Sequence, residues 1–354
     1  MDNEIFEKEI FSQPDDMLKT IEFIRNNNES IDFNISDINR IIFVGSGDSY
    51  IAPHSLLLII LKYINANILI LTPLEVFNYS YKLNDLVVLI SFSGESKQLI
   101  RTNKFLNTFK CRTVSITFNS KNTISDGCNY NYKIPVKSNR LTPHATDYMT
   151  TLLAISLLIE NITHKKIDVI NKLPIKVKEQ INYSYPLIKN VCKKIYKSRN
   201  YFFLGSGNSH GTCKYASAKL WEVGGIQSAD CKLDEFPHGM HLMANNSDTI
   251  FIISSNKKEY SIINDMSNIL QNIVKNVFVI TNTLKFKNNM SDVDCVIMPS
   301  VPIAPPSLKD LSDPYVYSKL NNLALRNTRL ANILNMCSIS IPLSNTRPTY
   351  KIVL

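Results

Sequence analysis

The sequence predicts an α/β protein made of two similar domains in tandem, each with a parallel sheet between helices. Short apolar strands alternate with helical segments along most of the chain, which is typical of a parallel sheet covered on both faces. One phrase also occurs twice: an apolar strand runs into Gly45-Ser46-Gly47 and a helix, and the pattern returns at Gly205-Ser206-Gly207. Two occurrences so far apart indicate duplication of a whole domain.

The first domain is expected over residues 1–165. Apolar residues at helical spacing predict a helix over residues 6–28. Runs of aliphatic residues then predict strands at residues 40–44, 68–71, 86–91, 113–117 and 131–134. Further helices are predicted at residues 52–63, after residue 96, and at residues 146–160, the last of which is strongly apolar.

A polar, helical segment over residues 166–198 is expected to connect the domains, with Pro174 and Pro186 as breaks. The second domain is expected over residues 199–354. Its predicted elements are strands at residues 201–204, 249–254, 277–281 and 294–298, and helices at residues 212–223, 262–274 and 321–336.

Composition excludes several classes of protein. The net charge of +9 is spread along the 354 residues without a run of five like charges, so no nucleic-acid partner is expected. The seven cysteines form no CxxC pair, and those in apolar surroundings are expected to be reduced core residues of a cytoplasmic protein: Cys192, Cys213, Cys295 and Cys337. The start of the chain does not look like a signal peptide, and the most apolar segment, residues 55–64, is too short to cross a bilayer.

Serine and glycine residues gather where two predicted strands of the first domain end. Such turns, at strand ends and helix starts, can cradle a phosphate with hydroxyl and backbone N–H groups. A P-loop and a dinucleotide fingerprint are both absent, because no Gly-Lys-Ser/Thr and no third glycine follow. The alternative is a solvated turn without a ligand. The candidate phosphate-binding residues are Gly47, Ser49, Ser91, Ser93, Gly94 and Ser96.

A second group of candidate residues lies in the second domain. Lys219 and Glu222 have the i, i+3 spacing at which helical side chains can pair, and His238 follows in a loop. A glutamate and a histidine suit sugar isomerisation, since one can carry a proton between adjacent carbons and the other can assist ring opening. A surface salt bridge and a loop histidine without a role are the alternatives.

These residues resemble the sugar isomerase (SIS) domain family, and most closely the paired SIS domains in the isomerase half of glutamine:fructose-6-phosphate amidotransferase. The resemblance covers residues 41–299. Its most specific part is a Lys-x-x-Glu helix followed by a Glu-x-x-His-Gly loop, which here are Lys219, Glu222, Glu235 and His238. The resemblance implies two tandem SIS domains, each a flavodoxin-like parallel sheet sandwiched by helices.

The resemblance also implies roles for individual residues. Ser49, Ser91, Ser93 and Ser96 match phosphate-binding positions, and Thr146 matches a further substrate contact. Glu222 matches the proton-transferring base, Lys219 a lysine near the substrate, and His238 a ring-opening histidine that reaches into the neighbouring subunit's site. Lys351 resembles a C-terminal lysine that forms a Schiff base with the open-chain sugar. A homodimer with sites at the subunit interface is therefore expected, without a metal or organic cofactor.

The chain departs from the family pattern at several places. Phe92 replaces a glutamine between the phosphate serines, and Asp147 replaces a lysine in the stretch at residues 141–147. The first residues lack the catalytic cysteine of a glutaminase half, so no glutamine-derived ammonia is expected. Residues 299–306 and 324–332 resemble a piece near the end of amidase-signature hydrolases; the alternative is the closing helix of the second domain.

The expected activity is interconversion of aldose and ketose aminosugar phosphates, most specifically of glucosamine 6-phosphate and fructose 6-phosphate with loss of ammonia. Two alternatives stay open. Deglycation of fructosamine 6-phosphates would use the same residues with a bulkier amine, and the room around residues 141–147 would decide it. A non-catalytic regulator that senses phosphosugars would bind without turnover.

Overall fold

The computed structural model describes residues 3–27, 31, 33–118, 122–136 and 145–282, and the backbone of short strands at residues 298–299, 341–342 and 351–353. The chain divides into two compact units. Unit 1 comprises residues 1–256 and 269–281, and unit 2 comprises residues 257–268 and 282–354. Unit 1 contains both large sheets and every candidate residue except Lys351.

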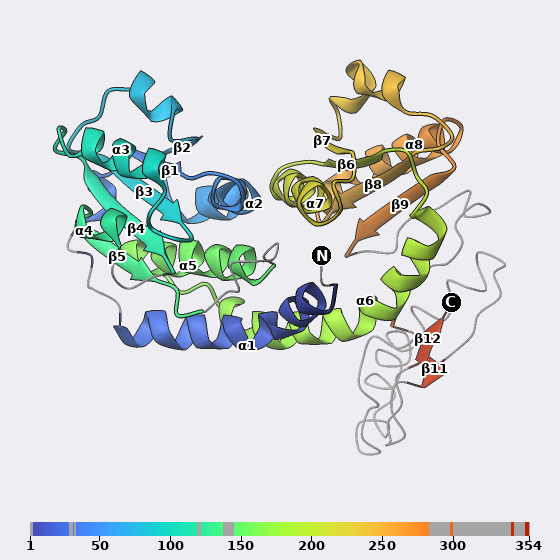
Figure 1. Cartoon of the computed structure of the whole chain (residues 1–354), viewed down its shortest axis with the longest axis horizontal. Coiled ribbons are helices and arrows are strands. Elements are labelled where there is room, and N and C mark those ends of the chain that lie inside the picture. The colour runs from blue at the N-terminus through green and yellow to red at the C-terminus, as the bar shows by residue number, and fades with distance from the viewer. Residues whose placement is uncertain are drawn as a thin grey trace, which may run out of the picture. The chain divides into compact units, whose positions relative to one another are not determined.

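The first sheet of unit 1 has five parallel strands in the order β2-β1-β3-β4-β5 (Figure 1). This is the flavodoxin order, in which the chain leaves β1 in opposite directions and creates a switch point between β1 and β3. We call this sheet and its helices the first domain. Its strands are β1 (Arg40–Val44), β2 (Asn67–Leu71), β3 (Asp85–Ser91), β4 (Arg112–Thr117) and β5 (Tyr130–Lys133).

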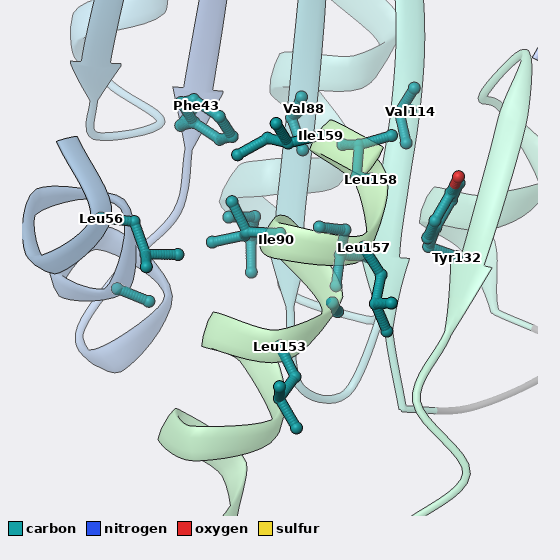
Figure 2. Packing of buried hydrophobic residues seen from close by; sticks show 14 of the residues in the cluster. Phe43, Leu56, Val88, Ile90, Val114, Tyr132, Leu153, Leu157, Leu158 and Ile159 are labelled. Atoms are coloured by element: carbon teal, nitrogen blue, oxygen red, sulfur yellow. The ribbon is translucent and has the colours of Figure 1, made fainter. Parts of the chain in front are cut away.

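Helices cover both faces of this sheet because alternate strand residues point to opposite sides. Phe43, Val88 and Val114 face one side, where Figure 2 shows them beside Leu158 and Ile159 of α5. The intervening strand residues face a separate core that includes α3. The helices are α1 (Asn3–Asn27), α2 (Asp48–Tyr63), α3 (Lys97–Leu106), α4 (Thr123–Asp126) and α5 (Thr146–Thr163).

The second sheet of unit 1 repeats this order with four described strands, β7-β6-β8-β9, all parallel (Figure 1). We call it and α7 the second domain. Its elements are β6 (Tyr201–Gly205), α7 (Asn208–Gly224), β7 (Ser228–Lys232), β8 (Thr249–Ser254) and β9 (Asn276–Thr281). Sequence analysis does not predict β7, because this partly buried edge strand, Ser-Ala-Asp-Cys-Lys, lacks an aliphatic run.

An ion pair shared by the two domains supports their origin by duplication. Arg40 Nε donates to Asp85 Oδ1 at 2.8 Å, and Arg199 Nε donates to Asp248 Oδ1 at 3.1 Å. Each aspartate also accepts a backbone N–H from a residue three positions earlier in the chain. Each pair joins the amino ends of the first and third strands of its domain. The two domains therefore have an equivalent tertiary contact in addition to equivalent Gly/Ser turns.

The connection between the domains corrects two predictions. Helix α6 (Leu173–Ile195) continues through Pro186, which is therefore not a break, while Pro174 sits in the first turn, where proline is tolerated. Cys192 lies on this helix and is exposed, so it is not a core residue as expected. Cys213 is buried as expected, and Cys295 and Cys337 lie outside the described residues.

Unit 2 contains most of α8 (Tyr260–Gln271) and a small antiparallel sheet in the order β10-β12-β11. Its strands are β10 (Met298–Pro299), β11 (Ile341–Pro342) and β12 (Lys351–Val353). The predicted helix at residues 321–336 and residues 294–297 of the predicted strand lie outside the described residues. Within the described part of the chain, no helix combines the length and the apolar character needed to cross a bilayer.

Candidate functional site

The turn after β1 requires glycine. Gly47 precedes α2 with φ 57° and ψ −129°, a conformation that L-residues rarely adopt. An added Cβ at Gly47 would have no atom within 4 Å, so the space over this turn is open. At Gly45 an added Cβ would lie 2.6 Å from the backbone of Ser49, so the turn folds tightly onto the start of α2. The N–H groups of the first helical turn lack partners within the helix, which makes this place suitable for an anion.

The turn after β3 is held by its own serines. Ser91 Oγ accepts the N–H of Gly94 at 3.1 Å, and Ser93 Oγ accepts the N–H of Glu95 at 3.1 Å. Gly94 has φ 68°, and an added Cβ would lie 2.2 Å from the side chain of Asn122. The serine hydroxyls therefore shape the turn, and Gly94 lets it approach the next loop.

The two turns lie at the same edge of the sheet, because β1 and β3 are adjacent parallel strands. This edge is the switch point, where open α/β sheets bind ligands. Ser96 precedes α3 and makes no capping hydrogen bond with its side chain. The structure thus brings Gly47 and Ser49 to the same sheet edge as the turn from Ser91 to Ser96. Phe92 packs on Phe118 with ring centroids 4.7 Å apart, so the residue in place of the family's glutamine is a packing residue.

The predicted Lys219–Glu222 pair is present, and it includes a third residue. Lys219 Nζ donates to Glu222 Oε2 at 2.6 Å and to Asp48 Oδ2 at 2.7 Å. The Lys219 side chain is 11% exposed and that of Asp48 21%, whereas that of Glu222 is 42% exposed. Asp48 directly precedes Ser49 at the start of α2. One ammonium group therefore links the glutamate of the second domain to the Gly/Ser turn of the first.

Two stacked aromatic rings lie next to Lys219. Lys219 Nζ lies 5.1 Å from the ring centroid of Tyr215, which stacks on Tyr148 of α5 at 3.7 Å and 9°. The hydroxyl of Tyr148 lies 2.5 Å from Ser55 Oγ on α2. Burial raises the pKa of both phenols well above its usual value, so both rings stay neutral near pH 7. Side chains from three helices thus fix the surroundings of Lys219.

The matching turn of the second domain is closed. Gly207 has nearly the same backbone as Gly47, with φ 52° and ψ −128°, but an added Cβ there would lie 2.7 Å from Leu58 Cδ1. Asn208, which corresponds in position to Asp48, accepts the N–H of Leu58 through Oδ1 at 2.8 Å. Since Leu58 sits against this turn, only the turn at Gly47 combines this backbone with open space in the described residues.

The remaining candidate residues lie elsewhere. His238 ends a short 3-10 helix that buried Phe236 anchors against Phe202, and its exposed imidazole has no hydrogen-bond partner among the described residues. Thr146 Oγ1 lies 3.4 Å from Ser12 Oγ on α1, so this hydroxyl contacts α1. Lys351 lies in β12 of unit 2. The roles assigned to these residues stay predictions.

Sequence reasoning missed Asp48, the residue that joins the two groups of candidates. Its only sequence signal is an acidic residue directly after the glycine of the turn, which by itself predicts a favourable charge at a helix start. Among the described residues, no cluster of three or more histidine, cysteine, aspartate or glutamate side chains could hold a metal ion. The site offers a carboxylate for proton transfer, an ammonium beside it, and a turn suited to an anion.

These features define a duplicated, doubly wound α/β protein whose candidate site lies at the switch point of its first sheet. The chain belongs to the SIS domain family, which matches residues 34–161 and 194–305. The two matched segments correspond to the two sheets described above.

Individual relatives agree with this assignment. The glutamine–fructose-6-phosphate aminotransferase (isomerizing) of Sulfurisphaera tokodaii is 23% identical over 303 residues, which are 84% of this chain and 50% of that protein. The chain thus spans about half the length of this relative. The C-terminal domain of glucosamine-fructose-6-phosphate aminotransferase from Francisella tularensis has a similar fold, with a TM-score of 0.71, 16% identity, and coverage of 81% of this chain and 86% of that one. Glucosamine-6-phosphate deaminase from Thermotoga maritima has a TM-score of 0.67 at 17% identity, covering 78% and 84%.

Proposed function

We propose that this chain is a sugar-phosphate isomerase acting on aminosugar phosphates, and that it converts glucosamine 6-phosphate to fructose 6-phosphate with release of ammonia. One observation carries the proposal. Lys219 joins Glu222 of the second domain to Asp48, which adjoins Ser49 in the open turn of the first. A group able to move a proton therefore lies close to a turn suited to a phosphate.

In the proposed complex, the phosphate binds at the switch point. Hydroxyl groups of Ser49, Ser91, Ser93 and Ser96 donate to its oxygens, and the backbone N–H groups at Gly47 and Gly94 contribute with the start of α2. A serine oxygen that accepts a backbone N–H can also donate its own proton to a phosphate oxygen. Binding through hydroxyl and N–H groups requires no lysine in the cradle.

The proposed reaction starts from the open-chain aldose. The Glu222 carboxylate removes the proton from C2, and the electrons of that C–H bond form a C1–C2 double bond as the C1 oxygen takes up a proton. Glu222 returns the proton to C1, which gives an imine at C2. Water adds to this imine and ammonia leaves, so that fructose 6-phosphate and ammonia are the products. Lys219 stabilises negative charge that develops on the substrate oxygen next to Glu222.

His238 and Lys351 belong to the same proposal through the SIS resemblance. The exposed His238 is free to enter the site of a partner subunit, where it would assist ring opening. Lys351 would form a transient imine with the C2 carbonyl of open-chain fructose 6-phosphate, with loss of one water that is taken up again when the lysine leaves. The role of His238 implies a homodimer as the active species. Two relatives support the choice of substrate by their names: the glutamine–fructose-6-phosphate aminotransferase of Sulfurisphaera and the glucosamine-6-phosphate deaminase of Thermotoga.

The proposal is tested by incubating the full chain with glucosamine 6-phosphate and measuring ammonia and fructose 6-phosphate together. We expect equal amounts of both products from the wild type. Glu222→Gln should bind the substrate but lose turnover by at least about 100-fold, because the amide cannot accept the proton. Glu179→Gln, an exposed glutamate of α6, is the matched control and should keep full activity.

The same assay separates the alternatives. If the chain binds hexose 6-phosphates from a panel but releases no ammonia from any of them, the proposed enzymatic activity is contradicted and a sensor is favoured. Turnover of a fructosamine 6-phosphate at a higher kcat/KM than glucosamine 6-phosphate would identify a deglycase instead. Wild-type rates in Glu222→Gln would overturn the assignment of Glu222 as the base.

A further inference from the structure

We propose that Asp48 is a positioning residue: its carboxylate holds the Lys219 ammonium in place, so that Glu222 can leave the ion pair and work on the substrate. This inference rests on the proposed function, and it assigns a role at the same site to a residue that neither the sequence nor the relatives single out.

The geometry shows two carboxylates that share one ammonium. Asp48 Oδ2 and Glu222 Oε2 lie at 2.7 Å and 2.6 Å from Lys219 Nζ, so the two contacts have nearly equal length. They differ in exposure. The side chain of Glu222 is 42% exposed, twice the 21% of Asp48. Of the two partners, Glu222 is the one with access to an incoming molecule.

Asp48 is also the better fixed of the two. It is the first residue of α2 and directly follows Gly47, whose backbone conformation is restricted to glycine. A carboxylate at this position is stabilised by the N-terminal end of the helix dipole. Asp48 belongs to a different helix from Lys219, whereas Glu222 lies one turn away on the same helix. Asp48 therefore ties Lys219 to the phosphate turn.

Other charged and titratable groups surround the pair. Tyr215 lies beneath Lys219 on α7, and Tyr148 and Asp147 approach from α5. Both carboxylates contact the same cation, Lys219. Without Asp48, the ammonium would be left with the i, i+3 partner on its own helix. Glu222 would then be held by the lysine, and the lysine would be free to follow Glu222 away from the turn.

A first experiment measures the position of Lys219 without any turnover. The full-length chain is acetylated with limiting acetic anhydride, and labelling of each lysine is quantified by mass spectrometry of peptides. We expect Asp48→Asn to increase labelling of Lys219 several-fold, because an ammonium with one carboxylate fewer is less buried and less firmly bound. Asp168→Asn, an exposed aspartate, is the control and should leave Lys219 labelling unchanged.

A second experiment measures the consequence for turnover of glucosamine 6-phosphate. We expect Asp48→Asn to lower kcat by about 100-fold, the order of loss caused by a misplaced catalytic group, with KM changed less than about threefold. Asp48→Glu restores a carboxylate and should regain most of the loss. The double variant Asp48→Asn with Lys219→Gln should be no slower than Lys219→Gln alone, since both changes remove the same contact.

The outcomes separate this inference from the proposed function. Increased labelling of Lys219 in a chain whose wild type turns over no sugar phosphate would overturn the function, but the finding that Asp48 holds Lys219 in place would stand. Unchanged labelling in Asp48→Asn would overturn the positioning role, whatever the activity. Additive losses in the double variant, or no recovery in Asp48→Glu of a normally folded protein, would contradict it as well.

Discussion

Asp48 Oδ2 lies 2.7 Å from Lys219 Nζ, and this contact joins two residues that are 171 positions apart. It lies where the start of α2 meets the later part of α7. The start of α7 meets the later part of α2 through Asn208 and Leu58. The two helices therefore run in opposite directions along each other, and the duplicated turns occupy related but chemically different places. One turn carries an aspartate and open space, and the other is closed by Leu58.

Ser91 is expected to bind the phosphate and not only to shape its turn. Ser91→Ala should weaken binding of fructose 6-phosphate by about 10- to 150-fold, since a hydrogen bond to a charged group contributes about 1.5–3 kcal/mol. Binding of fructose without the phosphate should not change. Isothermal titration calorimetry measures both. Ser156→Ala is the control, because Ser156 is similarly buried and also bonds to the local backbone. If both substitutions changed the affinity for fructose 6-phosphate equally, the assignment of Ser91 to the phosphate site would be contradicted.

Gly47 tests whether the turn conformation itself matters for binding. Gly47→Ala should cost about 1–3 kcal/mol in stability, because alanine rarely adopts this backbone, and should also weaken phosphate binding. Gly225→Ala is matched: Gly225 has φ 58° and an added Cβ would again meet no atom within 4 Å. We expect a similar direction of stability change there, without loss of binding. Chemical denaturation and calorimetry provide the two readouts, and intact binding in Gly47→Ala would contradict the cradle.

Much of the fold could be predicted because its signals are local. The aliphatic run at Arg40–Val44 defines β1 to the residue, and the repeated Gly/Ser turn correctly indicates the duplication. The two errors in the predicted secondary structure also have local causes. β7 was missed because an edge strand needs no aliphatic run, and α6 passes through Pro186 where a break was expected. The other backbone hydrogen bonds of this 23-residue helix outweigh the one that Pro186 cannot make.

The sequence predicts only part of the candidate site. The i, i+3 spacing predicts the contact of Lys219 with Glu222, since neighbours on one helix face are fixed by helix geometry. The contact with Asp48 depends on how α2 packs against α7, and no periodicity or spacing reports that packing. The same holds for the stack of Tyr148 on Tyr215, which joins α5 to α7.

Asp248 is expected to be essential for the stability of the second domain. Its fully buried carboxylate accepts hydrogen bonds from Arg199, Asn200 and Asn245. Asp248→Asn should cost about 2–4 kcal/mol, because an amide turns one acceptor into a donor that faces other donors. Thermal unfolding measures the loss, with Asp168→Asn as the exposed control. A melting temperature equal to that of the control would contradict this role.

The pH dependence of Asp248 has a definite sign. Burial alone would raise the pKa of this carboxyl, but the hydrogen bonds from Arg199 and Asn245 bring the pKa below its usual value of 3.8. The carboxylate therefore stabilises the fold above pH 3.8, and this contribution is lost as the pH falls below that value. Asp248→Asn should remove this part of the acid dependence.

His54 makes the stability of the fold depend on pH in a less acidic range than Asp248 does. Burial, followed by the charges of Lys214 and His210, lowers the pKa of His54 from 6.5 to about 4, while Asp230 opposes them. Between those values the unfolded chain binds a proton that the folded chain does not, so stability falls as the pH drops from 6.5 to about 4. One unit of pKa corresponds to about 1.4 kcal/mol, and with allowance for the part of the ring that contacts solvent we expect a loss of about 1–2 kcal/mol.

The test of His54 compares melting temperatures across this range. His54→Gln should flatten the fall in melting temperature between pH 6.5 and pH 4, because the amide takes up no proton. His164→Asn, which replaces an exposed histidine with a residue that tolerates its φ of 53°, should keep the wild-type slope. Identical slopes in all three proteins would show that His54 does not carry this dependence.

The most direct test of the central claim is hydrogen exchange at the substrate carbon. The full chain is incubated with fructose 6-phosphate and ammonium chloride in D₂O, so that the C2 imine can form, and incorporation of deuterium at C1 is followed by proton NMR. If Glu222 moves a proton between carbons of a bound sugar phosphate, the wild type will exchange one of the two C1 protons, and Glu222→Gln will not. Absence of exchange in the wild type, or equal exchange in both proteins, would contradict the account.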